Sequence, residues 1–401
     1  MSTPGFSASR LARMHRVLSG HVERRDMPGL VALVSHDEDV HIEEIGTLAF
    51  NNSAPMRCDT IFRIASITKP ITAVAAMILV EECKIRLDDS IEPWLPELAN
   101  RRVLRAISAE IDDTVPAQHA ITLRDLLTYR MGFGSVMAMP DTYPIQKFIR
   151  DYRIGGDGPP IPSQLPSMDE WLQKLGSLPL LAQPGERWMY NVSGDALGAL
   201  IARVSGQSLG TFMRERIFEP LGMNDTGFHV PPDKIDRLPA FYFFNQQTNA
   251  LDFFDDETTS AWSSPPPFEL GSGGLVSTID DYFAFSRMML NYGKLGGERI
   301  LSRATVEMVT TDQLTSEQRT GNEIFFGGHS SWGLGLAVNI RPSEIFHTPG
   351  RFGWDGGFGT SAYIDPAKGV IGILFTQRLV DSPEPTKVST DFWTLAYGAI
   401  E

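Results

Sequence analysis

Strand patterns mark both ends of this 401-residue chain, and the long stretch between them carries mostly helical ones. Residues 30–35 and 40–46 predict two strands joined by a turn. Near the other end, residues 361–365 and 370–377 predict a second hairpin. From residue 87 to residue 270, helical patterns alternate with loops rich in proline and glycine. The economical architecture is an α+β fold: an antiparallel sheet flanked by N- and C-terminal helices, with a large and mostly helical insertion.

We expect two domains that share a core. Residues 1–86 and 271–401 would form the α/β sheet domain, and residues 87–270 would form the helical insertion domain. Helical patterns within residues 1–26 and over residues 386–399 supply the helices that flank the sheet. The active site would then lie in the cleft between the two domains.

Composition excludes several classes of function. The net charge of −14 and the pI of about 5.1 argue against general binding to nucleic acid or to anionic membranes. No apolar run is long enough to span a bilayer, and the N-terminus has no secretion signal, so a cytoplasmic location is expected. The two cysteines and eight histidines show no metal-binding spacing, so no metal site is expected. The oligomeric state cannot be read from these features.

The segment Ser66-Ile67-Thr68-Lys69 lies where an extended apolar run gives way to a helical one. A serine followed by a lysine three residues later places a hydroxyl and an amine on the same face of a helix. A serine hydroxyl needs a nearby base to become a nucleophile, and a desolvated lysine can be that base. Serine is also a common N-cap, so the pattern alone leaves a structural role equally open.

Two further segments could complete a catalytic site around Ser66. Tyr190 lies on a turn before a predicted helix, and a phenol beside a lysine ammonium ionises more readily than a free one. A buried tyrosine is otherwise an ordinary core residue. The glycine-rich segment 352–360 precedes the C-terminal hairpin, where glycines either admit a ligand close to the backbone or mark a bulge.

A second serine pattern is misleading. Gly206-Gln207-Ser208-Leu209-Gly210 matches the G-x-S-x-G turn of α/β-hydrolases. That turn needs a strand before it, whereas residues 196–204 have a helical pattern. We therefore expect Ser208 to cap the following helix rather than to act as a nucleophile.

Together, Ser66-x-x-Lys69, Tyr190 and Trp354-Asp355-Gly356, in this order and at these separations, resemble the serine β-lactamase-like (penicillin-recognising) superfamily. The resemblance is closest to the class C β-lactamase-like branch, which includes the family VIII carboxylesterases. It covers nearly the whole chain and also includes these segments: Thr122–Thr128, Pro184–Glu186, Pro220–Met223 and Asp365–Pro366. Each motif is weak by itself, and their common order makes the resemblance specific.

The resemblance implies a role for each matching residue. Ser66 would be the acylated nucleophile, and Lys69 and Tyr190 would form the coupled base that accepts its proton. The backbone N–H groups of Ser66 and Gly357 would form the oxyanion hole. The strand at the edge of the cleft, which contacts the substrate, would comprise Trp354, Asp355 and Gly356.

Two positions depart from the family pattern. Val192 stands where the family usually has an asparagine, two residues after the tyrosine, and Asn191 stands next to the tyrosine instead. Trp354 stands where penicillin-recognising enzymes usually have a lysine. Both changes remove polar anchors for a β-lactam, so Val192 and Trp354 are expected to give the substrate site an apolar wall.

The resemblance and its departures predict a serine hydrolase that cleaves small carboxylic esters through an acyl-enzyme, without metal or cofactor. A β-lactamase, a D-amino-acid peptidase-like hydrolase and an acyltransferase are alternatives that share the acyl-enzyme. A non-enzymatic binding module is a different class of alternative, disfavoured because all three catalytic side chains are present.

Two loop regions are candidates for the walls of the acyl pocket. Residues 131–166 predict a long segment without regular structure, and such segments are usually functional or mobile. Residues 242–268 carry aromatic residues that either form an apolar rim or pack as ordinary loop residues: Phe243, Phe244, Phe253, Phe254 and Trp262.

Overall fold

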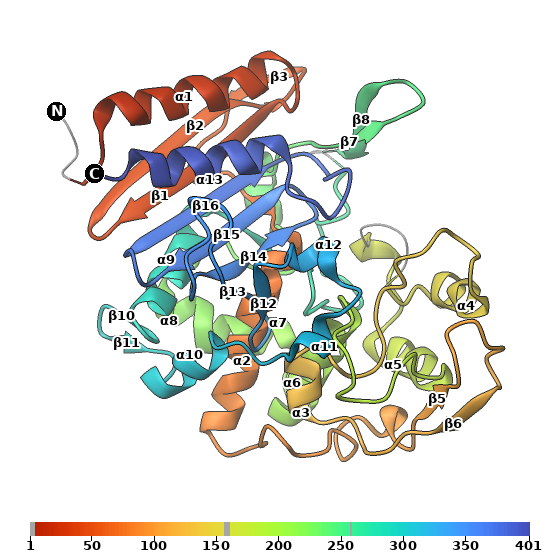
Figure 1. Cartoon of the computed structure of the whole chain (residues 1–401). Coiled ribbons are helices and arrows are strands. Elements are labelled where there is room, and N and C mark those ends of the chain that lie inside the picture. Colours follow the sequence, from red (N-terminus) through yellow and green to blue (C-terminus); the bar gives the residue numbers. More distant parts are fainter. Residues whose placement is uncertain (1–4, 156–160, 257–258) are drawn as a thin grey trace.

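An antiparallel sheet of eight strands, built from both ends of the chain, organises the molecule (Figure 1). The computed structural model describes residues 5–155, 161–256 and 259–401. The strand order is β12-β13-β14-β15-β16-β1-β2-β3. β1 (Gly29–His36) pairs with β16 (Val370–Thr376), so the first strand of the chain lies beside the last one.

Both predicted hairpins are present. β1 pairs with β2 (Asp39–Ala49), and β15 (Thr360–Asp365) pairs with β16, with Asp365 opposite Val370. The remaining strands of the sheet are β3 (Asn52–Pro55), β12 (Ser330–Trp332), β13 (Ala337–Asn339) and β14 (Phe352–Gly356). The described part of the chain also contains two-stranded sheets: β4 (Phe62–Arg63) with β9 (Val276–Ser277), β5 (Arg102–Leu104) with β6 (Thr114–Pro116), β7 (Phe241–Asn245) with β8 (Ala250–Asp255), and β10 (Lys294–Leu295) with β11 (Glu298–Arg299).

The terminal helices α1 (Ala8–Glu23) and α13 (Lys387–Ala399) lie side by side on one face of the sheet (Figure 1). Leu11, Met14 and Leu18 are buried along one side of α1. Their contacts with α13 and the outer face of the sheet make a hydrophobic core of their own. Burial of these apolar side chains holds the N-terminal helix against the C-terminal one.

The opposite face of the sheet is covered by α9 (Ile279–Leu290) and by the central helix α2 (Thr68–Glu81). Every residue of α2 from Thr68 to Leu79 is buried, as expected for a helix that is surrounded by protein on all sides. One large core cluster runs from the sheet through α2 into the middle of the chain. The α+β fold with an antiparallel sheet between flanking helices is therefore confirmed, whereas the exact domain boundaries stay a prediction.

Short helices dominate the middle of the chain and the segment before β12. They are α3 (Leu123–Leu127), α4 (Pro144–Tyr152), α5 (Met168–Ser177), α6 (Val192–Ser205), α7 (Leu209–Met213), α8 (Glu219–Leu221), α10 (Arg303–Val309), α11 (Ser316–Arg319) and α12 (Glu323–Phe326). Ser208 is the N-cap of α7, where its side chain accepts a hydrogen bond from the backbone N–H of Thr211, and α6 rather than a strand precedes it. The structural role expected for Ser208 is confirmed.

The segment 131–166 is more regular than predicted. It contains α4 and a 3-10 turn at Pro162–Gln164, although residues 156–160 lie outside the described part. Pro144 is the first residue of α4, a position where proline favours a helix because its missing N–H would have no partner there. The density of prolines therefore misled the prediction of a segment without regular structure.

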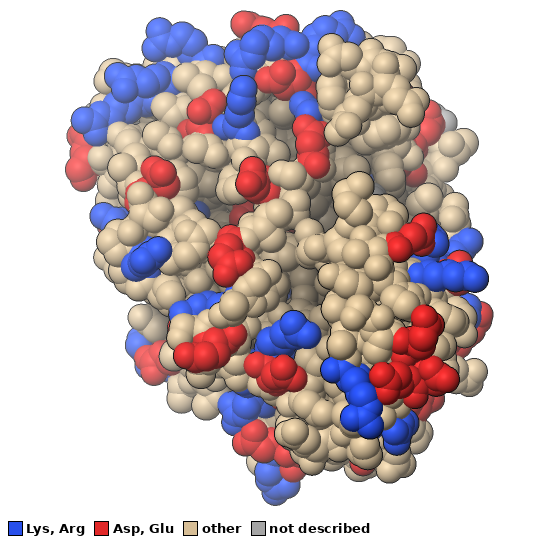
Figure 2. Space-filling view, turned by 45° about the vertical axis from the view of Figure 1, so that its right-hand side comes forward, with Lys and Arg blue, Asp and Glu red and all other residues tan. Residues whose placement is uncertain are grey.

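The described surface carries both signs of charge. Figure 2 shows lysine and arginine side chains interspersed with aspartate and glutamate side chains, around a hollow whose surroundings are largely uncharged. In the parts of the chain that the structure describes, no helix has both the length and the apolar character that a membrane span requires.

Candidate active site

Ser66 lies in a sharp elbow between β4 and α2. It belongs to a 3-10 turn, Ala65–Ile67, and Ala65 has a φ of +47°, a left-handed conformation that is uncommon for residues other than glycine. Ser66 is partly exposed, whereas every other residue from Ile61 to Pro70 is buried. Because α2 begins only at Thr68 and Ile67 occupies its N-cap position, Ser66 does not cap this helix. The elbow instead presents the Ser66 hydroxyl to the surface.

Two candidate bases meet at this hydroxyl. Lys69 Nζ and Tyr190 OH each lie 2.8 Å from Ser66 Oγ. Lys69 is 1% exposed, and its ammonium group also donates to Asn191 Oδ1 at 2.9 Å and to the carbonyl of Ser272 at 2.6 Å. Burial lowers the pKa of Lys69, and the nearby Tyr190 and Asp195 oppose that shift. A lysine with a lowered pKa is suited to accept a proton from the serine.

The position of Tyr190 is fixed by aromatic neighbours. Its ring centroid lies 5.7 Å from Trp188, 4.7 Å from Phe325 and 5.9 Å from Trp354. The indole N–H of Trp354 donates to Tyr190 OH at 3.2 Å. Trp354 is only 5% exposed, so it acts mainly as a hydrogen-bond donor to the tyrosine, a contact that the sequence did not indicate.

The predicted oxyanion hole is consistent with the backbone. Gly357 follows β14, and its N–H has no hydrogen-bond partner among the described residues. A hydrogen bond joins the β14–β15 hairpin to the elbow: the hydroxyl of Thr360, the first residue of β15, donates to the carbonyl of Ile64 at 2.8 Å. A Cβ added to Gly356 would lie 2.7 Å from the same carbonyl, so a side chain there would push the hairpin away from Ser66.

Two of the predicted substrate contacts need correction. Val192 is 0% exposed, so its side chain offers no surface to a substrate. The carboxylate of Asp355 accepts hydrogen bonds from Ser361 and Tyr363, and Ser361 also accepts one from Trp393 of α13. Neighbouring residues of a strand point to opposite faces, so Trp354 faces Tyr190 while Asp355 faces α13. Asp355 can contact a substrate only through its backbone.

The asparagine amide that the family pattern places at position 192 is supplied by position 191 in this chain. Asn191, with a φ of +78°, directs its side chain to Lys69. Asn191 has the backbone of a γ-turn, with a ψ of −64°, and the N–H of Val192 donates to the carbonyl of Tyr190 across it. This turn directs the Asn191 side chain into the site, and Val192, which follows it, is buried. The sequence shows the asparagine, but the backbone conformation that brings it to Lys69 becomes visible only in the structure.

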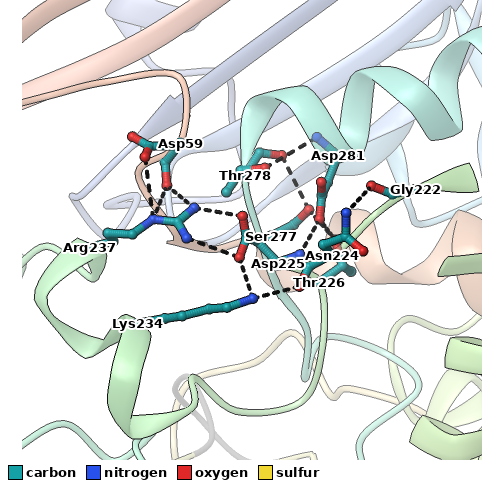
Figure 3. A network of polar contacts seen from close by, with 10 residues as sticks. All are labelled: Asp59, Gly222, Asn224, Asp225, Thr226, Lys234, Arg237, Ser277, Thr278 and Asp281. Atoms are coloured by element: carbon teal, nitrogen blue, oxygen red, sulfur yellow. Dashed lines mark hydrogen bonds and ion pairs between the residues drawn. The ribbon is translucent and has the colours of Figure 1, made fainter. Parts of the chain in front are cut away.

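A polar network joins the segment after α8 to β9 and α9 (Figure 3). Asp225 forms ion pairs with Arg237 and Lys234 at 2.6 Å and 2.8 Å. The carboxylate of Asp281 accepts hydrogen bonds from the backbone N–H of Asp225 and the hydroxyl of Thr226. The hydroxyls of Thr226 and Ser277 lie 2.8 Å apart, and Ser277 belongs to β9, which pairs with the strand β4 that leads into Ser66. The network therefore ties the segment after α8 to α9 and to the strand pair β4–β9 next to the nucleophile.

An apolar pocket lies beside the elbow. Residues that line it include Pro162, Leu165, Trp262, Phe268, Leu270 and Phe358, and none of its lining residues carries a charge. Ala65 packs in one cluster with Trp262 and Phe358, and a Cβ on Gly273 of the pocket wall would lie 3.5 Å from the carbonyl carbon of Ala65.

The predicted aromatic rim is only partly present. Trp262 lines the pocket, and Phe254 packs against Phe358 with ring centroids 6.1 Å apart. The hairpin β7–β8, which carries Phe243, Phe244 and Phe253, extends away from the body of the molecule (Figure 1). Phe253 is 52% exposed.

Among the residues that the structure describes, no group of three or more histidine, cysteine, aspartate or glutamate side chains is arranged to hold a metal ion. Catalysis without metal or cofactor stays a prediction.

Comparison with known proteins fits this geometry. The family model described as Beta-lactamase matches residues 14–390. Protein Rv1367c of Mycobacterium tuberculosis is 35% identical over 368 residues, covering 88% of this chain and 87% of that protein. Esterase EstB of Burkholderia gladioli is 27% identical over 398 residues, covering 92% and 91%. Among solved structures, EstCE1, described as a hydrolase with promiscuous acyltransferase activity, aligns with a TM-score of 0.77 at 23% identity, covering 97% of this chain and 99% of that one.

The chain therefore belongs to the Beta-lactamase family. Esterases and acyltransferases occur among its relatives, and the superfamily resemblance read from the sequence is confirmed.

Proposed function

We propose that this protein is a serine hydrolase that cleaves small carboxylic esters through an acyl-enzyme on Ser66. The observation that carries the proposal is the placement of Lys69 Nζ and Tyr190 OH, each 2.8 Å from Ser66 Oγ. A partly exposed hydroxyl between two potential proton acceptors is the arrangement that nucleophilic catalysis needs.

In the proposed reaction, Ser66 Oγ attacks the ester carbonyl carbon while the Lys69–Tyr190 pair accepts the hydroxyl proton. The backbone N–H groups of Ser66 and Gly357 stabilise the negative charge that develops on the carbonyl oxygen. The pair then returns the proton to the leaving alcohol, and the acyl group stays on Ser66. The same pair activates a water molecule that releases the acid and restores the serine. Apart from the ester and the water, every group in this scheme is a side chain or backbone group of the chain.

The uncharged pocket beside Ala65 supports an apolar acyl group. Its walls offer apolar surface and no cation that could hold a carboxylate of the substrate. Burial of apolar surface contributes about 25 cal/mol per Å², and the space between these walls is small, so a short acyl group is a more favourable occupant than a long chain. We propose short, uncharged aliphatic esters as the preferred substrates.

Two alternatives follow from specific observations. Acyl transfer to an alcohol uses the same acyl-enzyme, and EstCE1 is described as having such an activity. β-Lactam or D-amino-acid peptide hydrolysis is favoured by Asn191, whose amide is present in the site after all.

The test is steady-state hydrolysis of p-nitrophenyl butyrate and nitrocefin, with wild type, Ser66→Ala and Ser208→Ala compared side by side. Ser208→Ala is the matched control because this serine caps α7. We expect butyrate to turn over faster than nitrocefin, with both activities lost in Ser66→Ala and retained in Ser208→Ala. Full esterase activity in Ser66→Ala would contradict the proposal, and faster turnover of nitrocefin would favour the β-lactamase alternative.

A further inference from the structure

A buried carboxylate lies behind the candidate bases. Asp195 is 4% exposed and belongs to the first turn of α6, the helix that directly follows Tyr190 and Asn191. The segment that supplies the tyrosine to the site therefore also supplies this acid. A carboxylate in the first helical turn is favoured by the helix dipole, but that position does not require burial.

Asp195 and Lys69 are linked through Ser272, which forms hydrogen bonds with both. The backbone N–H of Ser272 donates to Asp195 Oδ1 at 3.0 Å, and the carbonyl of Ser272 accepts from Lys69 Nζ at 2.6 Å. The backbone of Ser272 is thus held by Asp195 through its N–H and holds the ammonium group of Lys69 through its carbonyl.

The turn that contains Ser272 has little room to move. The hydroxyl of Thr72, from α2, donates to the carbonyl of Gly271 at 2.7 Å. A Cβ on Gly271 would lie 2.4 Å from the carbonyl of Gly194, and a Cβ on Gly194 would lie 3.0 Å from Cα of Ser272. Close packing of these glycines keeps the carbonyl of Ser272 directed at Lys69.

The charge of Asp195 also acts on its surroundings. Burial raises its pKa to about 6, while hydrogen bonds from Ser272 and the positive charge of Lys69 oppose this shift. The titratable groups that face it are Lys69 from α2 and Tyr129 from the segment after α3. Near neutral pH the acid is mostly ionised and favours the ammonium form of Lys69, against the effect of burial. A catalytic base has to bind a proton and release it again. The negative charge of Asp195 would help Lys69 to hold that proton between the two steps.

We propose that Asp195 is a positioning residue that holds Lys69 through the Ser272 turn and, by its negative charge, sets the proton affinity of the Lys69–Tyr190 pair. The inference rests on the proposed function, because it gives Asp195 a role only if Lys69 and Tyr190 activate Ser66.

The test is the pH dependence of Ser66 acylation in wild type and Asp195→Asn. A fluorophosphonate is the probe, since it reports serine activation without depending on the true substrate. Removal of a negative charge lowers the pKa of every neighbouring group. The pH at which the labelling rate of Ser66 rises should therefore become lower, whichever residue of the pair holds the proton. We expect a shift of about one pH unit. The maximal labelling rate should also fall, by up to about tenfold, because a neutral amide oxygen accepts the N–H of Ser272 more weakly than a carboxylate does and holds the turn less firmly.

Asp365→Asn is the matched control. Asp365 is 1% exposed and accepts hydrogen bonds from a backbone N–H and from the hydroxyl of Tyr397, away from Ser66. Its pH profile should superimpose on that of wild type. Asp195→Ser is a second neutral variant, whose hydroxyl can accept the N–H of Ser272, should the asparagine variant fold poorly.

The outcomes separate the two proposals. A wild type that is not labelled on Ser66 contradicts the proposed function itself. If wild type is labelled on Ser66 and both neutral variants show the same pH dependence of labelling as wild type, the role of Asp195 is overturned and the proposed function still stands. An equal shift in Asp365→Asn would show a general effect of charge, which also overturns it.

Discussion

Two buried cations lie in different parts of the molecule, and only one of them is suited to catalysis. Lys69 is 1% exposed and Arg351 is 2% exposed. Both lie near aromatic rings, Lys69 Nζ at 4.7 Å from the ring centroid of Tyr190 and the Arg351 guanidinium at 3.8 Å from that of Tyr363. Burial lowers the pKa of both. Burial and an aromatic neighbour therefore do not by themselves mark a catalytic residue.

The partners of the two cations make the difference. Lys69 reaches the hydroxyl of Ser66, whereas the hydrogen bond described for Arg351 goes to the side-chain amide of Asn339 at 3.3 Å. A lysine can lose its proton when buried, but an arginine stays charged in proteins. Lys69 thus combines a reachable nucleophile with a proton that can move, and Arg351 lacks both.

The largest effect should separate the two cations directly. Lys69→Met removes the base and should lower kcat/KM for p-nitrophenyl butyrate by about 10²–10⁴-fold. Arg351→Met should change kcat/KM by no more than about threefold, because replacing a buried charge by an apolar residue acts mainly on stability. Kinetics together with a thermal melt of each variant provide the measurement. Comparable losses of activity in two well-folded variants would break the comparison.

The second prediction concerns stability and pH. The pKa of Asp195 in the folded protein, about 6, lies above its ordinary value of 3.8. Below about pH 4 the acid is protonated in both states, and its contribution to stability is fully present. As the pH rises through about 6, the folded state has to bury a charge, and a shift of roughly two units corresponds to about 3 kcal/mol of lost stability.

Asp195→Asn lacks this titration. Its free energy of unfolding, relative to that of wild type, should therefore increase between about pH 4 and pH 7, as denaturant unfolding at each pH would measure. A difference that stays constant over this range would show that Asp195 has the same pKa in the folded and unfolded states, contrary to the account. A difference that keeps increasing well above pH 7 would show that Asp195 does not ionise inside the folded protein. If the expected increase is observed, Asp195→Asn combines higher relative stability near neutral pH with lower activity, a common trade-off at active sites.

A smaller effect is expected at Trp354. Trp354→Phe keeps the aromatic packing but removes the N–H that donates to Tyr190 OH. Loss of one such hydrogen bond is worth about 1 kcal/mol, so kcat/KM should fall by roughly fivefold to tenfold. Trp332→Phe is a control, because its indole N–H donates to the backbone carbonyl of Leu127 instead. An equal loss in both variants would assign the effect to packing.

The smallest effect is expected on the other face of the same strand. Asp355 bonds to Ser361 and Tyr363, away from Ser66. Asp355→Asn should change kcat/KM by less than about threefold while altering the melting temperature. A loss as large as that of Lys69→Met would mean that the outer face takes part in the reaction, contrary to the structure.

The sequence predicts those parts of the site that depend on local order. The roles of Ser66, Lys69 and Tyr190 follow from the family resemblance that their motifs carry, and the β15–β16 hairpin follows from alternation and a turn. Periodicity also reveals that Trp354 and Asp355 lie on opposite faces, but not which face meets the cleft. That choice depends on how β14 packs against the elbow, where Thr360 bonds to Ile64.

Other features needed the three-dimensional structure. The positive φ angles of Ala65 and Asn191 have no reliable sequence signal, since neither residue is a glycine. Asp195 is five residues beyond Tyr190 in the chain, yet its link to Lys69 runs through Ser272, which is distant in sequence. A contact of this kind depends on tertiary packing, which no local pattern encodes.

The most direct test of the central claim is to find which residue becomes covalently modified. Wild type, Ser66→Ala and Ser208→Ala would each be treated with a fluorophosphonate and analysed by mass spectrometry of the intact protein and its peptides. The account predicts one adduct per chain, on Ser66, in wild type and in Ser208→Ala, and no adduct in Ser66→Ala. An adduct that persists in Ser66→Ala, or that maps to another residue in wild type, would contradict it.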